Sequence, residues 1–371
     1  MKSAWRIGRI AGIDIYIDSS WILIFVLFTW SLAGSFFPHG YPGWSPSLYW
    51  IVGAATSLLV FVSVLIHELA HSIVAERQGE KVSRITLFLL GGVSQITEEP
   101  KEPLQEFAMA FVGPLTSFVL AGVFFLVSFF LAPLSRPLHA AALYLAVINA
   151  GLGVFNLLPG FPLDGGRVLR SILWKATGSL KKATRLASAI GQGFAFLFIV
   201  FGILRILRGD LGGLWPILIG WFLHSAAVRS YEQVMVRSAL QGLTAGDLMT
   251  QDFATVPEGL SVQMLVDDYI LKKKERVFLV AGDGGLRGIV CLEDVKAVPR
   301  ERWPRASVGE IMTPREKLVS VTPDADGNRV LESLASRNVH QVPVLVGDRV
   351  AGIICRNDVL RVLQLRAELG V

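Results

Sequence analysis

Six apolar segments fill most of the first 240 residues, and they restrict the chain to folds that a lipid bilayer can hold. They begin near Trp21, Trp50, Phe107, Ala140, Leu186 and Gly213. Each is roughly 18 to 25 residues long, enough to cross a hydrocarbon core of about 30 Å. The composition agrees, because 52% hydrophobic and 18% charged residues are unusual in a soluble protein. The sequence therefore predicts a polytopic α-helical membrane protein with about six transmembrane helices.

Positive charges are distributed unevenly between the loops that join these segments. Lysine and arginine cluster before the first segment, after the second and after the fourth, within residues 2–9, 77–101 and 167–185. The opposite loops are poorer, and residues 38–48 contain no lysine or arginine. Because loops rich in these residues stay in the cytoplasm, we expect a multi-pass protein of the cell membrane with both termini cytoplasmic.

After about residue 238 the sequence becomes charged, with short strand-like runs between Gly-Asp turns. It also repeats itself, because LMT at 248–250 recurs as IMT at 311–313 and GIVCLEDV at 288–295 recurs as GIICRNDV at 352–359. Two copies favour one pseudo-symmetric pair of β-α modules over an open-ended solenoid. We therefore expect a membrane domain at 1–237, a first soluble repeat at 238–302 and a second at 303–371.

The second apolar segment contains HELAH at residues 67–71. In a helix this spacing puts His67 and His71 on one face, where their nitrogens can share a metal ion. Glu68 lies beside them and can act as a general base, taking a proton from water and passing it to a leaving amine. The pattern also arises by chance, but ionisable residues are costly to insert into an apolar segment and mark functional sites there. The sequence therefore predicts a metal site.

A catalytic zinc ion usually has three protein ligands, so one more is expected elsewhere in the chain. The best candidate is Asp164 in NLLPGFPLDGGR, which directly follows the fourth apolar segment. Two prolines interrupt the helix there, and two glycines allow the backbone to approach a site closely. The charge assignment also puts Asp164 at the same end of the membrane as the two histidines. An alternative role, compatible with the first, is to cap the following helix.

HELAH together with NLLPGFPLDGGR at 156–167 resembles the site-2 protease family of intramembrane zinc metalloproteases. The resemblance spans roughly residues 5 to 230 and includes GPLTS at 113–117. It implies that one zinc ion per chain is bound by His67, His71 and Asp164.

The same resemblance assigns the remaining catalytic roles. It implies that Glu68 activates water and that Asn156, eight residues before Asp164, helps to stabilise the oxyanion. Asn149 is a weaker candidate for that role. The substrates implied are transmembrane segments of other proteins, cut near their cytoplasmic side.

Two further segments have strand-like patterns. The N-terminal residues alternate between polar and apolar, which predicts an N-terminal strand, and they lack the apolar core of a signal peptide. The segment ITLFLLGGVSQIT, at residues 85–97, is too short for a separate span and predicts a re-entrant hairpin around Gly91 and Gly92. Its unpaired edge would suit an extended peptide. A surface amphipathic loop is the alternative.

The soluble repeat resembles a pair of CBS domains over about residues 242 to 367. This resemblance implies an adenosine nucleotide in the cleft between the copies, with Asp294 and Asp358 as its carboxylate contacts. Cys291 and Cys355 stand where the family has hydroxyls, and a thiol is a poorer hydrogen-bond donor. The alternative is a structural module that joins two chains in a homodimer.

We therefore expect an intramembrane zinc metalloprotease that a nucleotide at the CBS pair regulates. The alternative from another functional class is a metal-binding transporter or channel regulated by CBS domains, and the role of Glu68 separates the two. Nucleic acid is not an expected partner, because the net charge of +5 is scattered through loops beside the bilayer.

Overall fold

The computed structural model describes residues 4–80, 82–88, 91–96, 100–273, 275–282, 285–336, 339, 341–347 and 349–369. The chain forms two compact units, Met1–Glu232 and Gln233–Val371, and the division falls inside helix α8 (Leu214–Leu240). The first is called the membrane unit below, because it holds the apolar segments. The second is called the repeat unit, because it holds both copies of the repeat.

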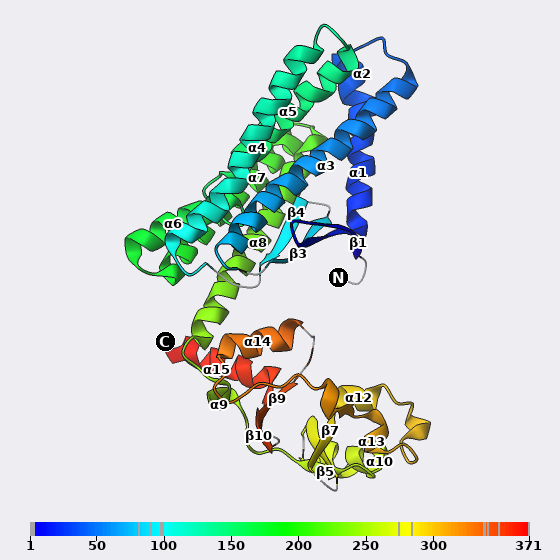
Figure 1. Cartoon of the computed structure of the whole chain (residues 1–371), viewed down its shortest axis with the longest axis vertical. Coiled ribbons are helices and arrows are strands. Elements are labelled where there is room, and N and C mark those ends of the chain that lie inside the picture. Colours follow the sequence, from blue (N-terminus) through cyan, green and yellow to red (C-terminus); the bar gives the residue numbers. More distant parts are fainter. Residues whose placement is uncertain are drawn as a thin grey trace. The chain divides into compact units, whose positions relative to one another are not determined.

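Within the described part of the chain, six helices are long and apolar enough to cross a bilayer, in agreement with the six expected spans. They cover Ser19–Gly40, Pro46–Arg77 (α3), Pro103–Leu131 (α4), Arg136–Asn156 (α5), Leu180–Leu207 (α7) and Leu211–Leu240. The first consists of α1 (Ser19–Ser31), η1 (Leu32–Phe36) and α2 (Phe37–Gly40), and the last of η2 (Leu211–Gly213) and α8. In Figure 1, α1, α3, α4 and α5 run alongside one another.

Many large apolar side chains of these helices face outward. Trp30, Phe129 and Phe196 are each at least 65% exposed. Exposure of so many large apolar side chains is unfavourable in water and suits contact with lipid. The interior instead uses small residues where helices meet: a Cβ on Gly202 would lie 2.4 Å from the main-chain oxygen of Gly213. Close helix approach through small residues is typical of membrane proteins.

A four-stranded sheet packs beside these helices. It has the order β1 (Ala4–Ile10), β2 (Ile13–Asp18), β3 (Val82–Phe88) and β4 (Gly91–Ile96), and only β2 and β3 are parallel. The N-terminal residues thus form two strands instead of the one expected, with a tight turn at Ala11 and Gly12 where both φ angles are positive. Strands β3 and β4 confirm the hairpin expected over residues 85–97, and β4 is an edge strand of this sheet.

Helix α3 supports the sheet. Ile13 of β2 and Ile85 of β3 are fully buried against Leu69, which lies between the two histidines of HELAH. The side chain of Asp18, the last residue of β2, accepts a hydrogen bond from the N–H of Ser20 and so caps α1. The sheet is therefore attached directly to the helix that carries the candidate metal ligands.

The repeat unit contains two copies of a β-α module. The first copy includes β5 (Thr255–Pro257), α10 (Val262–Met264), η3 (Leu265–Ile270), α11 (Leu271–Lys273), β6 (Val277–Gly282), β7 (Gly285–Cys291), α12 (Leu292–Lys296) and η4 (Arg300–Arg302). The second includes η5 (Arg315–Lys317), α14 (Gly327–Ser336), β9 (Gln341–Val346), β10 (Arg349–Cys355) and α15 (Arg356–Leu369). The short helix α9 (Ala245–Leu248) ends on the first residue of LMT, and α13 (Val308–Ile311) ends on the first residue of IMT. Strand β8 (Thr313–Pro314) begins on the last residue of IMT.

These motifs join the two copies reciprocally. Thr250, in the LMT motif of the first copy, pairs with Ile353 in the second copy, and Thr313, in the IMT motif of the second copy, pairs with Ile289 in the first. Gly288, the first residue of GIVCLEDV, permits the close approach of Thr313, because a Cβ on Gly288 would lie 2.4 Å from the main-chain oxygen of Thr313. The paired repeats of the sequence are therefore one interlocked structure.

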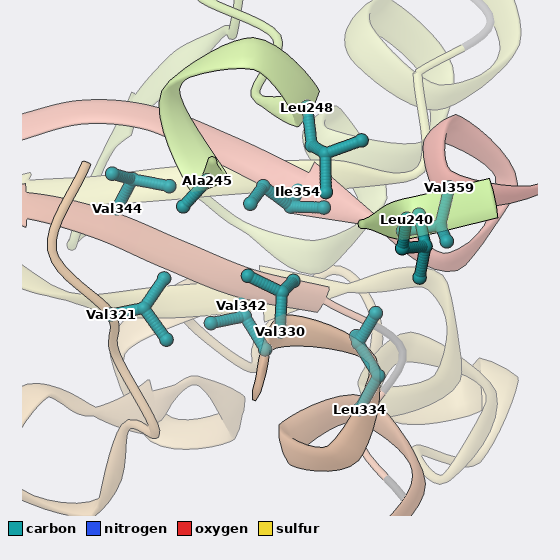
Figure 2. Close-up of a cluster of buried hydrophobic side chains, with 10 residues drawn as sticks. All are labelled: Leu240, Ala245, Leu248, Val321, Val330, Leu334, Val342, Val344, Ile354 and Val359. Atoms are coloured by element: carbon teal, nitrogen blue, oxygen red, sulfur yellow. The ribbon is translucent and has the colours of Figure 1, made fainter. Parts of the chain in front are cut away.

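The repeat unit has two apolar cores, and each is completed by residues that precede the other copy's motif. Figure 2 shows the core of the second copy, in which Val342 and Val344 of β9 and Ile354 of β10 meet Val330 and Leu334 of α14. All five are at most 1% exposed. Burial of such side chains contributes roughly 1.5–3 kcal/mol each.

Candidate metal centre

Three side chains from two helices meet inside the membrane unit. His67 and His71 lie on α3 and are buried, and Asp164 is the first residue of α6 (Asp164–Thr177). The Nε2 atoms of the two histidines are 3.1 Å apart, and Oδ2 of Asp164 lies 3.1 Å from one and 3.2 Å from the other. The structure thus brings together the three candidate ligands that the sequence singled out.

The donor set fits a zinc ion. Ligand atoms around a tetrahedral zinc ion with bonds of about 2.0–2.1 Å are separated by roughly 3.3 Å, close to the distances between these three atoms. Two imidazoles and one carboxylate are also a donor set typical of catalytic zinc, and three protein ligands leave one position of the tetrahedron for water or substrate.

Helix α4 holds both imidazole rings by their other nitrogen. Nδ1 of His71 donates to the main-chain oxygen of Met109 at 2.6 Å, and Nδ1 of His67 lies 2.9 Å from Oγ of Ser117. A proton on Nδ1 leaves the lone pair of Nε2 free to bind a metal. The contact with Met109 therefore selects the tautomer of His71 that a metal site requires, whereas the hydroxyl of Ser117 orients the ring of His67 and can pair with either tautomer.

Gly113 lets α4 approach this closely. A Cβ on Gly113 would lie 2.1 Å from Nε2 of His71 and 2.8 Å from Nε2 of His67. Any side chain at this position would occupy the space that the two coordinating nitrogens share.

Glu68 follows the first histidine and is contacted by the edge strand β4. Oγ of Ser94 donates to Oε2 of Glu68 at 2.9 Å, and Oγ of Ser72 donates to Oγ of Ser94 at 3.1 Å. Gly92 permits the contact, because a Cβ there would lie 2.5 Å from Cγ of Glu68. The carboxylate of the candidate general base is therefore adjacent to the outermost strand of the sheet.

The loop between α5 and α6 brings Asp164 to the histidines. It lies tightly against α7, because a Cβ on Gly191 would be 2.1 Å from the main-chain oxygen of Phe161, and the N–H of Phe161 donates to the oxygen of Ala187 at 3.3 Å. The N-cap residue of α6 is Leu163. The alternative in which Asp164 caps this helix is therefore wrong, and its carboxylate faces the histidines.

The two candidate asparagines differ in how they are engaged. Asn149 is buried, and its Nδ2 donates to Oγ of Ser63 at 3.2 Å and to the main-chain oxygen of Leu145 at 2.8 Å. Asn156 is the half-buried last residue of α5. Because the donors of Asn149 already have partners inside the protein, Asn149 is poorly suited to donate to a bound substrate. The role of Asn156 stays a prediction.

The repeat unit holds a second candidate site, a cavity of about 410 Å³. Both copies line it, with Thr250, Asp252, Phe253, Glu275, Arg276, Val277 and Glu293 from the first half and Gln341, Ile353, Cys355, Arg356, Asn357, Asp358 and Arg361 from the second. Asp358 thus faces the cavity as expected, whereas Asp294 is not among its lining residues.

Both carboxylates also cap a helix. Oδ2 of Asp294 accepts from the N–H of Cys291, and Oδ2 of Asp358 accepts from the N–H of Cys355, each at 2.8 Å. Sγ of Cys291 donates to Asp294 as well, at 2.9 Å. Burial raises the pKa of both thiols to about 11, so they stay protonated at neutral pH. The cysteine at position 291 therefore fills the capping role of a hydroxyl.

Several residues of the metal centre were not singled out from the sequence alone. Ser94, Met109 and Ser117 contact Glu68 or the histidines, yet none has a diagnostic spacing of its own. A usable signal is the series Met109, Gly113 and Ser117, which lies on one face of α4 at helical spacing. Small and polar residues on one face of an apolar helix indicate a close helix contact.

We expect Gly113→Ala to weaken zinc binding about tenfold or more, because the new methyl group would overlap the coordinating nitrogens. Zinc affinity of the purified chain, measured by competition with a chelator, checks this. Gly122→Ala in the same helix is the matched control, since a Cβ there meets no atom within 4 Å. Equal affinities for the two variants would contradict the assignment.

Removal of the hydroxyl of Ser117 should also weaken zinc binding, by about 10–100-fold, because His67 then loses the partner that orients its ring. The control is Thr116→Ala, whose hydroxyl bonds only to the main-chain oxygen of Val112 in its own helix. The same competition titration compares Ser117→Ala with this control. If both bind zinc as tightly as wild type, Ser117 does not support the ligand.

Comparisons with known proteins identify the family. The Peptidase family M50 model matches residues 55–141 and 134–200, and the CBS domain model matches residues 245–301 and 308–365. A Synechocystis protein, named as a candidate zinc metalloprotease, is 38% identical and aligns over 99% of this chain and 97% of its own length. The zinc metalloprotease MJ0392 of Methanocaldococcus jannaschii is 32% identical over 100% of this chain and 99% of its own.

Among solved structures, the site-2 protease from Methanocaldococcus jannaschii is 31% identical, covers 62% of this chain and 95% of that chain, and superposes with a TM-score of 0.43. The family expected from the motifs is thus confirmed by relatives that align over nearly the whole chain. The chain is a metalloprotease of peptidase family M50, the site-2 protease family, and carries two CBS domains after its membrane unit.

Proposed function

We propose that the chain is an intramembrane zinc endopeptidase that hydrolyses peptide bonds in or near transmembrane segments of other proteins. The observation that carries the proposal is the convergence of His67, His71 and Asp164 within 3.2 Å of one another, with Glu68 beside them on α3. The names of the relatives as zinc metalloproteases support the choice of metal.

The residues have separate roles in this mechanism. His67, His71 and Asp164 hold the zinc ion, which acts as a Lewis acid when bound. Glu68 takes a proton from the attacking water and passes it to the leaving amine. Asn156 donates a hydrogen bond to the oxygen that becomes negative as the carbonyl is attacked. Helix α4 keeps His71 in the tautomer that leaves Nε2 available, and it orients the ring of His67 through Ser117.

The substrate is a membrane protein whose scissile segment unwinds. Strand β4 is at the edge of its sheet and contacts Glu68 through Ser94, so a peptide that pairs with β4 would lie beside the general base. A helical segment cannot pair in this way until its own hydrogen bonds open. The distribution of positive charges supports cytoplasmic termini and cleavage near the cytoplasmic side.

The CBS pair regulates this activity by binding an adenosine nucleotide. The cavity between the copies has lining groups of both signs, among them Arg356, Asp358 and Arg361. Arginine recognises phosphate, and a carboxylate accepts hydrogen bonds from ribose hydroxyls. The alternative role, in which the pair joins two chains in a homodimer, stays a prediction.

The decisive test compares the wild-type chain with Glu68→Gln in detergent, using a single-span membrane protein as substrate. The amide cannot accept the proton, so we expect cleavage to fall by about 10²–10⁴-fold. Zinc content should stay unchanged, because Glu68 is not a ligand. Product analysis by mass spectrometry and metal analysis on the same samples measure both quantities.

The outcome also separates the protease from a CBS-regulated metal transporter or channel. Loss of zinc from Glu68→Gln with cleavage intact would contradict the proposed roles. If neither sample cuts any of several substrates while both hold zinc, a transport function gains support, and zinc flux into vesicles tests it directly.

A pair of matched variants tests the nucleotide site. Asp358→Asn and Asp294→Asn make the same change at equivalent helix caps, but of the two only Asp358 lines the cavity. We expect Asp358→Asn to weaken binding of AMP, ADP or ATP about tenfold or more, since a hydrogen bond to a charged group contributes roughly 1.5–3 kcal/mol. Asp294→Asn should bind like wild type. Equal effects of the two changes in calorimetric titration would contradict this assignment.

A further inference from the structure

Glu106 and Arg170 form an ion pair in the interior of the membrane unit. Glu106, in the first turn of α4, is completely buried, and Arg170 of α6 is 5% exposed. Nε of Arg170 donates to Oε1 of Glu106 at 2.6 Å, and Nη2 of Arg170 contacts the same oxygen. Nε of Arg167 lies 3.8 Å from it. The mechanism proposed above uses none of these charges.

Stability alone is a weak reason for such a pair. Moving two ions out of water costs hydration free energy, and the attraction between them offsets little more than this cost. Apolar residues of similar volume are often at least as stabilising. The cost is higher where the surroundings are lipid and helices. A directional, charge-assisted hydrogen bond does, however, fix the position of one helix along another in a way that apolar contacts do not.

The pair fixes the helix that presents the third ligand. Arg170 lies six residues after Asp164 on α6, and its guanidinium also stacks over the ring of Phe161, 5.1 Å from the centroid. Phe161 lies in the loop that leads into α6. Arg170 thus belongs to the helix that begins at Asp164 and contacts the loop that precedes it.

The other end of the pair lies on the helix that orients the histidines. Glu106, Met109, Gly113 and Ser117 follow one another at helical spacing on one face of α4. Met109 and Ser117 contact the histidines, and Gly113 lies directly beside both imidazoles. A single face of α4 therefore contacts the two histidines and, through Arg170, the helix that begins at Asp164.

We propose that Glu106 and Arg170 are positioning residues that set Asp164 at the correct distance from His67 and His71. The inference rests on the proposed function, because it concerns the same zinc site. The pair acts through the placement of α6 and touches neither metal nor substrate. Its loss therefore lowers zinc affinity even where the fold stays intact.

The test measures zinc affinity by chelator competition and thermal unfolding side by side, on the full-length chain in detergent. Glu106→Gln and Arg170→Gln each remove one charge and should weaken zinc binding about tenfold or more. Arg170→Lys keeps the charge but loses the planar fork, so it should give a smaller loss. His139→Ala is the control, because it removes a bond from Nδ1 of His139 on α5 to the main-chain oxygen of Ser128, near the opposite end of α4. It should bind zinc like wild type.

A double variant separates positioning from stability. Glu106→Leu combined with Arg170→Met replaces the pair by apolar side chains of similar size, which should restore the melting temperature lost in the single variants. Zinc affinity should remain about tenfold below wild type, because no directional bond then holds α6. Recovery of full affinity together with stability would overturn the proposal and leave the pair a purely structural role.

The result also distinguishes this inference from the proposed function. If wild type binds zinc and cuts its substrate while the double variant does both equally well, only the positioning role fails. If wild type binds no zinc at all, the proposed function fails, and the positioning role falls with it.

Discussion

The close approach of α4 to α3 is the contact on which the metal centre depends. At Gly113 there is no room for even a methyl group beside the two imidazoles. This approach lets Met109 and Ser117 reach the Nδ1 atoms, so that both Nε2 atoms point to the position where Asp164 arrives. The same contacts give the Nδ1 atoms hydrogen-bond partners, which buried polar atoms of a multi-pass membrane protein must find within the protein.

The ligands themselves could be predicted from sequence because their geometry is local. The four-residue spacing of His67 and His71 determines that both lie on one helical face whatever surrounds it. Asp164 was predicted from its motif and from the topology of the spans. The six helices and the paired soluble repeats were also predictable, because long apolar runs and an internal repeat are strong signals.

The supporting contacts could not be predicted in the same way. Which face of α4 turns inward depends on packing against α3 and α6, and the partnership of Glu106 with Arg170 joins residues 64 positions apart. The second N-terminal strand escaped prediction because its turn is formed by Ala11 and Gly12, a weak signal in a short alternating segment. Cys291 is a poor hydrogen-bond donor to a nucleotide, but its sulfur caps α12. This capping role was not predicted from the sequence.

The central claim is that two imidazoles and one carboxylate bind the zinc ion. X-ray absorption at the zinc edge of the purified, zinc-loaded chain measures this first coordination sphere directly. The account predicts nitrogen and oxygen neighbours only, with the signature of two imidazoles at about 2.0–2.1 Å. A sulfur neighbour at about 2.3 Å would place the zinc at a cysteine instead, and a sphere without imidazole would likewise contradict the account.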